Sequence, residues 1–156
     1  MFKHILAAVD GSGTSTRALR AALALAGEQR SRLTIVHVVD TVPVIVDSPY
    51  DPTDYQAAAR KAGEQVLRRA AAMAQKAGVP ATPRLLELQQ VADRAADGIV
   101  DAARQARADL IVIGTHGRRG VSHLLLGSVA ESVVRIASMP VLLIRGKPER
   151  RARRGS

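Results

Sequence analysis

Five short apolar segments alternate with four longer segments of helical spacing along the whole chain. The apolar segments cover residues 4–9, 32–39, 82–88, 109–114 and 140–145. The segments between them cover residues 14–30, 53–78, 92–107 and 127–138. Apolar strands that alternate with helices form a parallel sheet, because the connecting helices carry the chain back across its faces. The sequence therefore predicts an α/β fold of three layers, in which four helices cover both faces of a five-stranded parallel sheet.

Apolar residues within the helical segments show which faces should turn toward the sheet. In the first segment these are Ala18, Leu19, Ala22, Leu23 and Ala26, and in the last they are Val129, Val133, Ile136 and Ala137. Thr53 with Gln56 three residues later has the pattern of a capping box. Gly78, shortly before Pro80, is typical of a helix end. The three prolines in residues 40–52 predict a long loop.

The composition excludes several classes of function. The 156 residues are enough for one domain with a full core. Cysteine is absent, which rules out disulfides, thiolate metal sites and cysteine nucleophiles. Only 2% of the residues are aromatic, so the chain lacks the stacking surfaces with which proteins hold single-stranded nucleic acid. No apolar run approaches the ~18 residues that span a bilayer and no signal-peptide pattern is present, so we expect a cytoplasmic protein without a membrane partner.

The net charge of +9 is concentrated at the C-terminal end of the sequence. Residues 145–156 contain six basic residues and one acidic residue, so this short segment carries more than half of the excess charge. Such a run of like charges is usually solvated and disordered. We therefore expect a domain over residues 1–145 and a basic disordered tail over residues 146–156, with no specific nucleic-acid partner.

The expected topology indicates where a ligand would bind. In open parallel sheets, ligands bind beyond the carboxyl ends of the strands, at the point where the strand order reverses. The residues that directly follow the predicted strands are therefore candidates for a site. They are Asp10 after the first strand, residues 38–40 after the second, and residues from Gly114 onward after the fourth.

Glycines recur at a distinctive spacing after the fourth predicted strand. Gly114 and Gly117 are separated by two residues, and nine more precede Gly127. Ser128 then opens a helical segment. Glycines let the backbone approach a ligand and aim its N–H groups at phosphate, and a helix start adds the positive end of its dipole. These features predict a phosphate site that needs no P-loop lysine.

Two of the candidate residues have simpler alternative roles. Ser128 with Glu131 three residues later also forms the pattern of a capping box, and such a cap contributes ~1 kcal/mol to helix stability. A hydrogen bond to charged phosphate contributes about 1.5–3 kcal/mol, so Ser128 could serve in both roles. Asp10, which precedes Gly11, is a turn residue, the cap of the following helix or a ligand-binding residue.

The histidines suggest a metal site or a general base. His116 and His123 lie seven residues apart with no acidic residue between them, which is not a usual spacing for metal ligands. Metal binding by this pair is therefore disfavoured. His4 and His37 lie within predicted strands, and we expect them to be packed in the core or at its edge.

Three blocks occur in the order "HILAAVDGS", "DLIVIGTHGRRG" and "LLGSVAESVVRIASMPVLLIR". They resemble the first strand with its acidic turn, the fourth strand with its loop, and the last helix and strand of the universal stress protein family, in its ATP-binding branch. The resemblance implies a Rossmann-like sheet of strand order 3-2-1-4-5. It also implies a homodimer through the last strand, residues 141–145, and a role as a stress-response regulator or sensor that acts through an unknown regulatory protein partner.

Carried over residue by residue, the resemblance implies a site for ATP together with Mg²⁺. The residue that matches Val38 would contact adenine through its backbone, and Asp10 would lie near the adenosine and serve as the Mg²⁺ ligand. The implied cofactor-binding residues are Ala8, Val9, Asp10, Val38, Gly114, Thr115, His116, Gly117, Arg118, Gly127, Ser128 and Val129.

Two other functions compete with this interpretation. One is a nucleotide-activating transferase or a slow ATPase on the same fold, although the HxGH and SGGxD signatures usual in such transferases are absent. The other is an interaction module without nucleotide, although the glycine spacing that such members lose is intact here. We expect little or no ATP turnover and assign no catalytic residue, because only Asp10, His116 and Glu131 lie near enough to act as a base.

Overall fold

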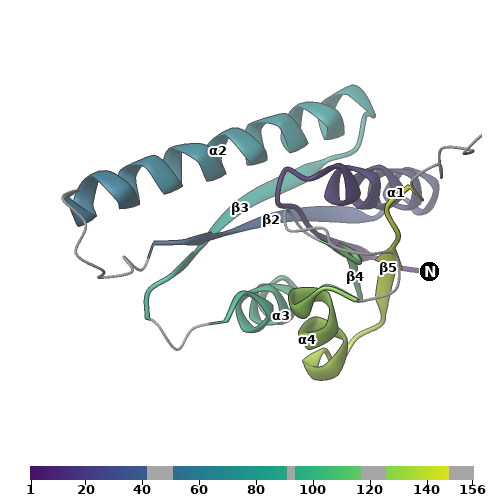
Figure 1. The fold of residues 1–156 in the computed structure, drawn as a ribbon. Coiled ribbons are helices and arrows are strands. Elements are labelled where there is room, and N and C mark those ends of the chain that lie inside the picture. The colour runs from purple at the N-terminus through teal and green to yellow at the C-terminus, as the bar shows by residue number, and fades with distance from the viewer. Residues whose placement is uncertain (42–50, 91–93, 117–125, 148–156) are drawn as a thin grey trace, which may run out of the picture.

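The computed structural model of the chain shows helices and strands in alternation (Figure 1), and it describes residues 1–41, 51–90, 94–116 and 126–147. The strands are β1 (His4–Ala8), β2 (Arg32–Asp40), β3 (Ala81–Leu88), β4 (Leu110–Gly114) and β5 (Val141–Ile144). The helices are α1 (Gly13–Gln29), α2 (Pro52–Lys76), α3 (Ala95–Ala106) and α4 (Ser128–Ile136).

Within the described residues, the strands form one parallel sheet of order β3-β2-β1-β4-β5. This arrangement confirms the predicted α/β class and the strand order that the family resemblance implies. The central strand β1 pairs on both sides, and its Ile5 stands opposite Leu33 of β2 and Leu110 of β4. The chain builds outward from β1 first toward β3 and then toward β5, so the order reverses between β1 and β4.

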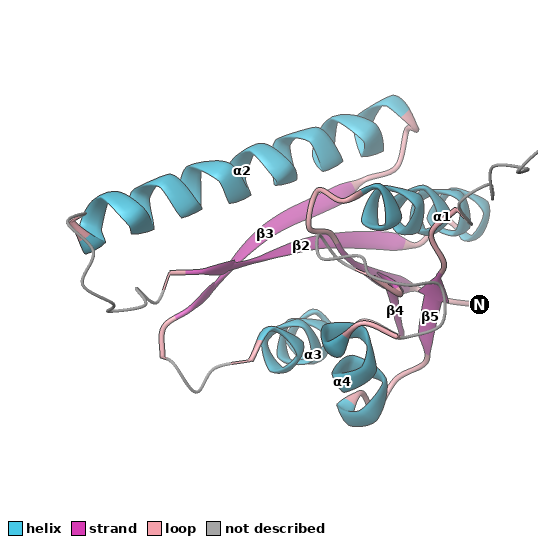
Figure 2. Cartoon of the chain, in the orientation of Figure 1, coloured by secondary structure: helices cyan, strands magenta, loops and turns pink. Residues whose placement is uncertain are grey.

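Helices α1 and α2 cover one face of the sheet, and α3 and α4 cover the other (Figure 2). Ile5 and Ala7 of β1 belong to the core beneath α1 and α2, whereas Leu6 and Ala8 belong to the core beneath α3 and α4. All four are buried, because successive side chains point to opposite faces and both faces are covered. In the described ranges, no helix is long and apolar enough to cross a membrane.

Helix α2 begins and ends earlier than predicted. The side chain of Asp51 accepts the backbone N–H of Thr53 at 2.8 Å and caps the helix, and Pro52 is its first residue. Proline suits this position because its fixed φ is helical and no N–H partner is needed there. The predicted capping box at Thr53 is therefore wrong. The helix ends at Lys76, and Gly78 takes a φ of +69°, in the left-handed region that lets the chain turn toward β3.

The helices that cover the second face also differ from their predicted ranges. Helix α3 begins at Ala95 and α4 ends at Ile136, so both are shorter than expected. In α4, Ala130 and Val133 are buried, but Val129 is 39% exposed although its spacing predicted a core position. Val129 lies in the first turn of α4, beyond the carboxyl ends of the strands.

Candidate functional site

A cavity of about 520 Å³ lies at the carboxyl ends of β1 and β4, where the strand order reverses. Sites for small molecules have volumes of ~300–1,000 Å³, so this cavity can hold a ligand of nucleotide size. Its lining residues come from both faces of the sheet and from the starts of α1 and α4. They are Ala8, Val9, Asp10, Ser15, Val36, His37, Val38, Asp40, Leu88, Ala95, Ile99, Ile113, Gly114, Thr115, His116, Leu126, Gly127, Ser128, Val129 and Ala130.

The structure brings together at this cavity every residue of the implied nucleotide site that it describes. The strand ends contribute Ala8, Val9, Asp10, Val38, Gly114, Thr115 and His116, and α4 with its cap contributes Gly127, Ser128 and Val129. Gly117 and Arg118, together with His123, lie outside the described residues. The position of a site beyond the strand ends thus agrees with what the topology predicts.

Asp10 lies at the end of β1, and it takes part in the turn that leads to α1. Its Oδ1 accepts the N–H of Ser12 at 2.9 Å, and its own N–H donates to Ser15 Oγ at 3.2 Å. Ser12 is the residue that caps α1, since its side chain accepts the N–H of Ser15 at 3.1 Å. Asp10 is therefore a turn residue and not the helix cap. The same bonds hold its carboxylate at the cavity wall.

Two glycines let neighbouring backbone segments approach each other closely around the cavity. A Cβ atom on Gly114 would lie 2.8 Å from Cγ2 of Thr14, in the first turn of α1. A Cβ atom on Gly127 would lie 3.0 Å from the carbonyl oxygen of Thr115. The N–H of Gly127 donates to this same oxygen at 2.7 Å, so the start of α4 is fixed against the end of β4. The absence of side chains at Gly114 and Gly127 thus lets the starts of α1 and α4 pack closely against the end of β4.

Ser128 is the first residue of α4, and Gly127 is its N-cap without a side-chain bond. The capping box predicted for Ser128 and Glu131 is therefore wrong. Glu131 pairs instead with Arg135, one turn along the helix, at 2.7 Å. The first N–H groups of a helix have no partner within it. Those of residues 128–130, with the positive end of the helix dipole, are therefore available to a ligand in the cavity that these residues line.

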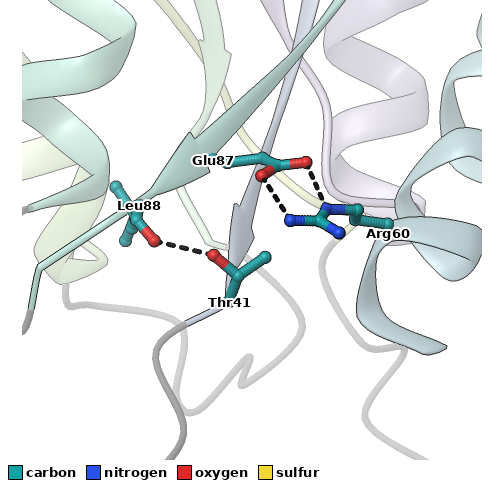
Figure 3. Close-up of polar contacts among 4 residues, drawn as sticks. All are labelled: Thr41, Arg60, Glu87 and Leu88. Atoms are coloured by element: carbon teal, nitrogen blue, oxygen red, sulfur yellow. Dashed lines mark hydrogen bonds and ion pairs between the residues drawn. The ribbon is translucent and has the colours of Figure 1, made fainter. Parts of the chain in front are cut away.

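The opposite end of the cavity lies at the ends of β2 and β3 and is mainly apolar. Its walls are formed by Val36, Val38, Leu88 and Ile99, and the exposed Asp40, opposite Leu88, adds one carboxylate. Figure 3 shows the contact that joins these strand ends, in which Thr41 Oγ1 donates to the carbonyl oxygen of Leu88 at 2.8 Å. Beside it, Arg60 of α2 donates to the two carboxylate oxygens of Glu87, at 2.7 and 3.2 Å. These bonds fix the edge of the sheet that borders the apolar end.

Several cavity residues were not anticipated from the sequence. Leu88 is the last residue of β3 and lines the cavity. The rule that ligands bind beyond strand ends would have predicted Leu88 if it had also been applied to this strand. Ile99 belongs to the apolar face of α3, and its spacing predicts a core position and nothing more. His37 is packed as predicted, with 8% of its surface exposed, but its place on the cavity wall has no signal in the sequence.

In each of the two cavity histidines, His37 and His116, one ring nitrogen is hydrogen-bonded to another group of the protein. His116 Nδ1 lies 2.9 Å from Thr115 Oγ1, and its Nε2 is buried without a hydrogen-bond partner among the described residues. A buried polar atom without a partner costs ~1–3 kcal/mol, which favours a ligand atom at this position. His37 Nδ1 donates to the carbonyl oxygen of Val9 at 2.7 Å. A carbonyl can only accept, so Nδ1 of His37 carries a proton.

Within the parts of the chain that the structure describes, no three His, Cys, Asp or Glu side chains are grouped closely enough to hold a metal ion. Mg²⁺ does not require such a group, because it is usually bound by one or two carboxylates together with phosphate oxygens and water. The carboxylate of Asp10, at the cavity wall, therefore fits Mg²⁺ only in company with phosphate.

Comparison with known proteins connects this site to a family. The sequence model of the universal stress protein family matches residues 1–145. The chain belongs to the universal stress protein family. A universal stress protein of Thermus aquaticus is 40% identical over 146 residues, which cover 93% of this chain and 100% of that protein.

Two solved universal stress proteins share the fold. One, from Burkholderia pseudomallei, is 41% identical with a TM-score of 0.73, and the match covers 91% of this chain and 95% of that chain. Another, from Archaeoglobus fulgidus and in complex with dAMP, is 26% identical with a TM-score of 0.66. That match covers 92% of this chain and 98% of the other. The family relationship therefore extends over nearly the whole chain, cavity included.

Proposed function

We propose that this universal stress protein binds ATP, together with Mg²⁺, in the cavity between β1 and β4. The observation that carries the proposal is the contrast between the two ends of the cavity, one mainly apolar and the other formed by the start of α4. ATP has the same contrast, because its adenine end is largely apolar and its triphosphate end is charged. The dAMP complex of the Archaeoglobus fulgidus relative supports an adenine nucleotide as the ligand.

The phosphate end relies on backbone groups in place of a lysine. The N–H groups of residues 128–130 and the hydroxyl of Ser128 donate to phosphate oxygens, and the dipole of α4 favours their negative charge. Each hydrogen bond to a charged group contributes about 1.5–3 kcal/mol, so a few of them suffice for tight binding. His116 Nε2 finds its partner on the ligand. The family resemblance adds Gly117 and Arg118, which lie outside the described residues.

The base lies at the apolar end, between the side chains that line it. The backbone of Val38 contacts the adenine, and Ala8 and Val9 form the floor beneath the adenosine. Asp10 stands between the two ends and holds Mg²⁺ through its carboxylate. When bound, Mg²⁺ neutralises part of the charge of the phosphates.

We propose further that the protein stores ATP as a signal and turns it over slowly, as a stress-response regulator or sensor read by a protein partner. Fast phosphoryl transfer needs a positioned base and groups that stabilise the transition state more than the bound substrate. Of the three candidate bases, Asp10 is engaged by Ser12 and Glu131 by Arg135. The third, His116, has only the hydroxyl of Thr115 at its Nδ1 among the described residues, and no carboxylate that would support it as a base. Backbone N–H groups around the phosphates bind the ground state and the transition state about equally strongly, so they do not lower the barrier to phosphoryl transfer.

The test is to measure what the protein holds and how ATP changes its melting temperature. Protein purified without added ligand should release adenine nucleotide when it is denatured and chromatographed. After removal of this nucleotide, ATP at 100 times its Kd should raise the melting temperature by about 5–10 °C. The absence of any ATP-dependent rise in the parent protein would overturn the proposal.

Two glycine variants make a matched pair for this measurement. In Gly127→Ala, the new Cβ lies 3.0 Å from the Thr115 carbonyl, so the start of α4 must move and we expect less than half of the ATP-dependent rise. Half of the rise corresponds to an affinity about tenfold lower. In Gly27→Ala, the nearest atom is Cγ2 of Val79 at 3.8 Å, an ordinary contact away from the cavity, and the full rise should remain.

A further inference from the structure

We infer that His37 is a positioning residue for the adenine base. Its ring N–H donates to the Val9 carbonyl, so that this carbonyl does not pair with Val38 and the backbone groups of Val38 can bind the ligand. This inference rests on the proposed binding of ATP and explains why adenine is selected. The deciding contact is the 2.7 Å hydrogen bond from His37 Nδ1 to the Val9 oxygen, at the point where β1 ends.

The pairing of β1 with β2 shows which backbone groups of β2 point toward β1. The register of this pair ends with Ala8 opposite Val36, and the N–H of Val9 then donates to the Val36 carbonyl at 2.9 Å. Val36 therefore directs its backbone groups at β1. Backbone directions alternate along a strand, so Val38, two residues later, directs its N–H and C=O to the same side. Beyond Val9 the chain turns away at Gly11, whose φ is +81°.

In an uninterrupted parallel ladder, the next bond would run from the N–H of Val38 to the carbonyl of Val9. Among the described residues, the backbone bonds beyond the paired strands include the one from Val9 to Val36 and none from Val38 to Val9. The Val9 carbonyl accepts the His37 ring N–H instead. The N–H and C=O of Val38 therefore face the cavity, which Val38 lines.

The imidazole ring is held firmly in the orientation that this bond needs. It is 8% exposed, and α2 passes over it at Gly63. A Cβ atom on Gly63 would lie 2.9 Å from Cδ2 of the ring, so the glycine makes the room in which His37 sits. The ring therefore cannot rotate away from Val9 without displacing α2.

An N–H and a C=O side by side on one residue match the edge of adenine. Adenine presents an acceptor, N1, next to a donor, the 6-amino group, whereas guanine presents a donor and an acceptor in the reverse order. A site with fixed hydrogen-bonding groups rejects a ligand that leaves them unpaired. By freeing both groups of Val38, His37 gives the cavity its preference for adenine over guanine.

The first experiment tests the arrangement in the nucleotide-free protein by NMR. The His37 ring should show the tautomer protonated at Nδ1, and the amide hydrogen of Val38 should exchange far faster than that of Val36. In His37→Leu, the Val9 carbonyl becomes available and the amide of Val38 should become protected. A Val38 amide as protected as that of Val36 in the parent protein would overturn the inference.

The second experiment compares the binding of ATP, GTP and tripolyphosphate, which lacks the base. In His37→Leu, ATP affinity should fall about tenfold and the preference over GTP should shrink, while tripolyphosphate affinity stays within about twofold. His37→Asn places an amide N–H where Nδ1 stands and should restore most of the ATP affinity. Equal losses for ATP and tripolyphosphate, or unchanged ATP affinity, would refute the role of His37. If the parent protein binds no ATP, the proposed function itself fails.

Discussion

At the residue scale, two serines stand at helix starts in different roles. Ser12 caps α1 with its side chain, whereas Ser128 is the first residue of α4 and leaves the cap to Gly127. Ser128→Ala should therefore leave the melting temperature of the nucleotide-free protein nearly unchanged. Its affinity for ATP should fall about tenfold or more, because one hydrogen bond to phosphate is lost. Isothermal titration calorimetry and thermal melts measure the two effects separately.

Ser12→Ala is the matched control for this prediction. Loss of the bond to the N–H of Ser15 should cost ~1 kcal/mol of stability, which lowers the melting temperature by roughly 2–4 °C. Its effect on ATP affinity should be smaller than that of Ser128→Ala. If Ser128→Ala instead lowers stability as much as Ser12→Ala and leaves ATP affinity unchanged, Ser128 serves the helix and not the phosphate.

At the element scale, β5 is the edge strand that we propose as the dimer contact. The carbonyl of Pro140 accepts a hydrogen bond from Ile111 of β4, and that of Ile144 accepts one from Thr115, directly after β4. The alternate residues Val141 and Leu143 therefore direct their backbone groups at the open edge. An open edge strand can pair with a second copy of itself. Leu143→Pro removes an outward N–H but no bond to β4, and light scattering should then show monomers.

Leu143→Val keeps the backbone N–H and should remain dimeric, which separates loss of pairing from a change of side chain. Both variants should remain folded, because proline is tolerated at sheet edges, although Leu143→Pro also loses the packing of the Leu143 side chain against the core beneath α3 and α4. A parent protein that is monomeric, or a proline variant that stays dimeric, would place any contact between copies elsewhere.

The elements themselves were largely predictable from sequence, whereas their exact starts and part of the site were not. The strands follow from short apolar runs that only a sheet covered on both faces can bury. The start of α2 was missed because Asp51 and Pro52 compete with Thr53 as start signals, and the choice depends on three-dimensional geometry. Residues that follow strands, such as Asp10, were found because topology alone places them. Ile99 and His37 were not, because only packing between distant elements brings them to the cavity.

At the scale of the whole molecule, two groups at the amino ends of the strands link stability to pH. Burial, with a further contribution from Arg32, lowers the pKa of His4 below its ordinary value of 6.5. Burial opposes ionisation of Asp109, but the N–H groups of Lys3 and His4, at 2.9 and 3.1 Å, together hold the pKa of Asp109 below its ordinary value of 3.8. Folding therefore favours neutral His4 and ionised Asp109.

These shifts predict that acid destabilises the protein in two stages. Below pH 6.5 the unfolded chain binds a proton at His4 that the folded chain does not, so the free energy of unfolding falls by at most about 1.4 kcal/mol per pH unit until the lowered pKa of His4 is reached. Below pH 3.8 the unfolded chain likewise protonates Asp109 first, which removes further stability. Urea unfolding at a series of pH values measures both stages.

Two variants assign the stages to their residues. His4→Gln keeps a hydrogen-bonding partner for Thr34 Oγ1, which lies 2.8 Å from His4 Nε2, but has no proton to gain, so its stability should change less below pH 6.5. The remaining histidines are present in both proteins, so the difference between the two curves isolates His4. Asp109→Asn should flatten the second stage and leave the first intact. Stability curves that run parallel to that of the parent protein at every pH would show that neither group carries the linkage.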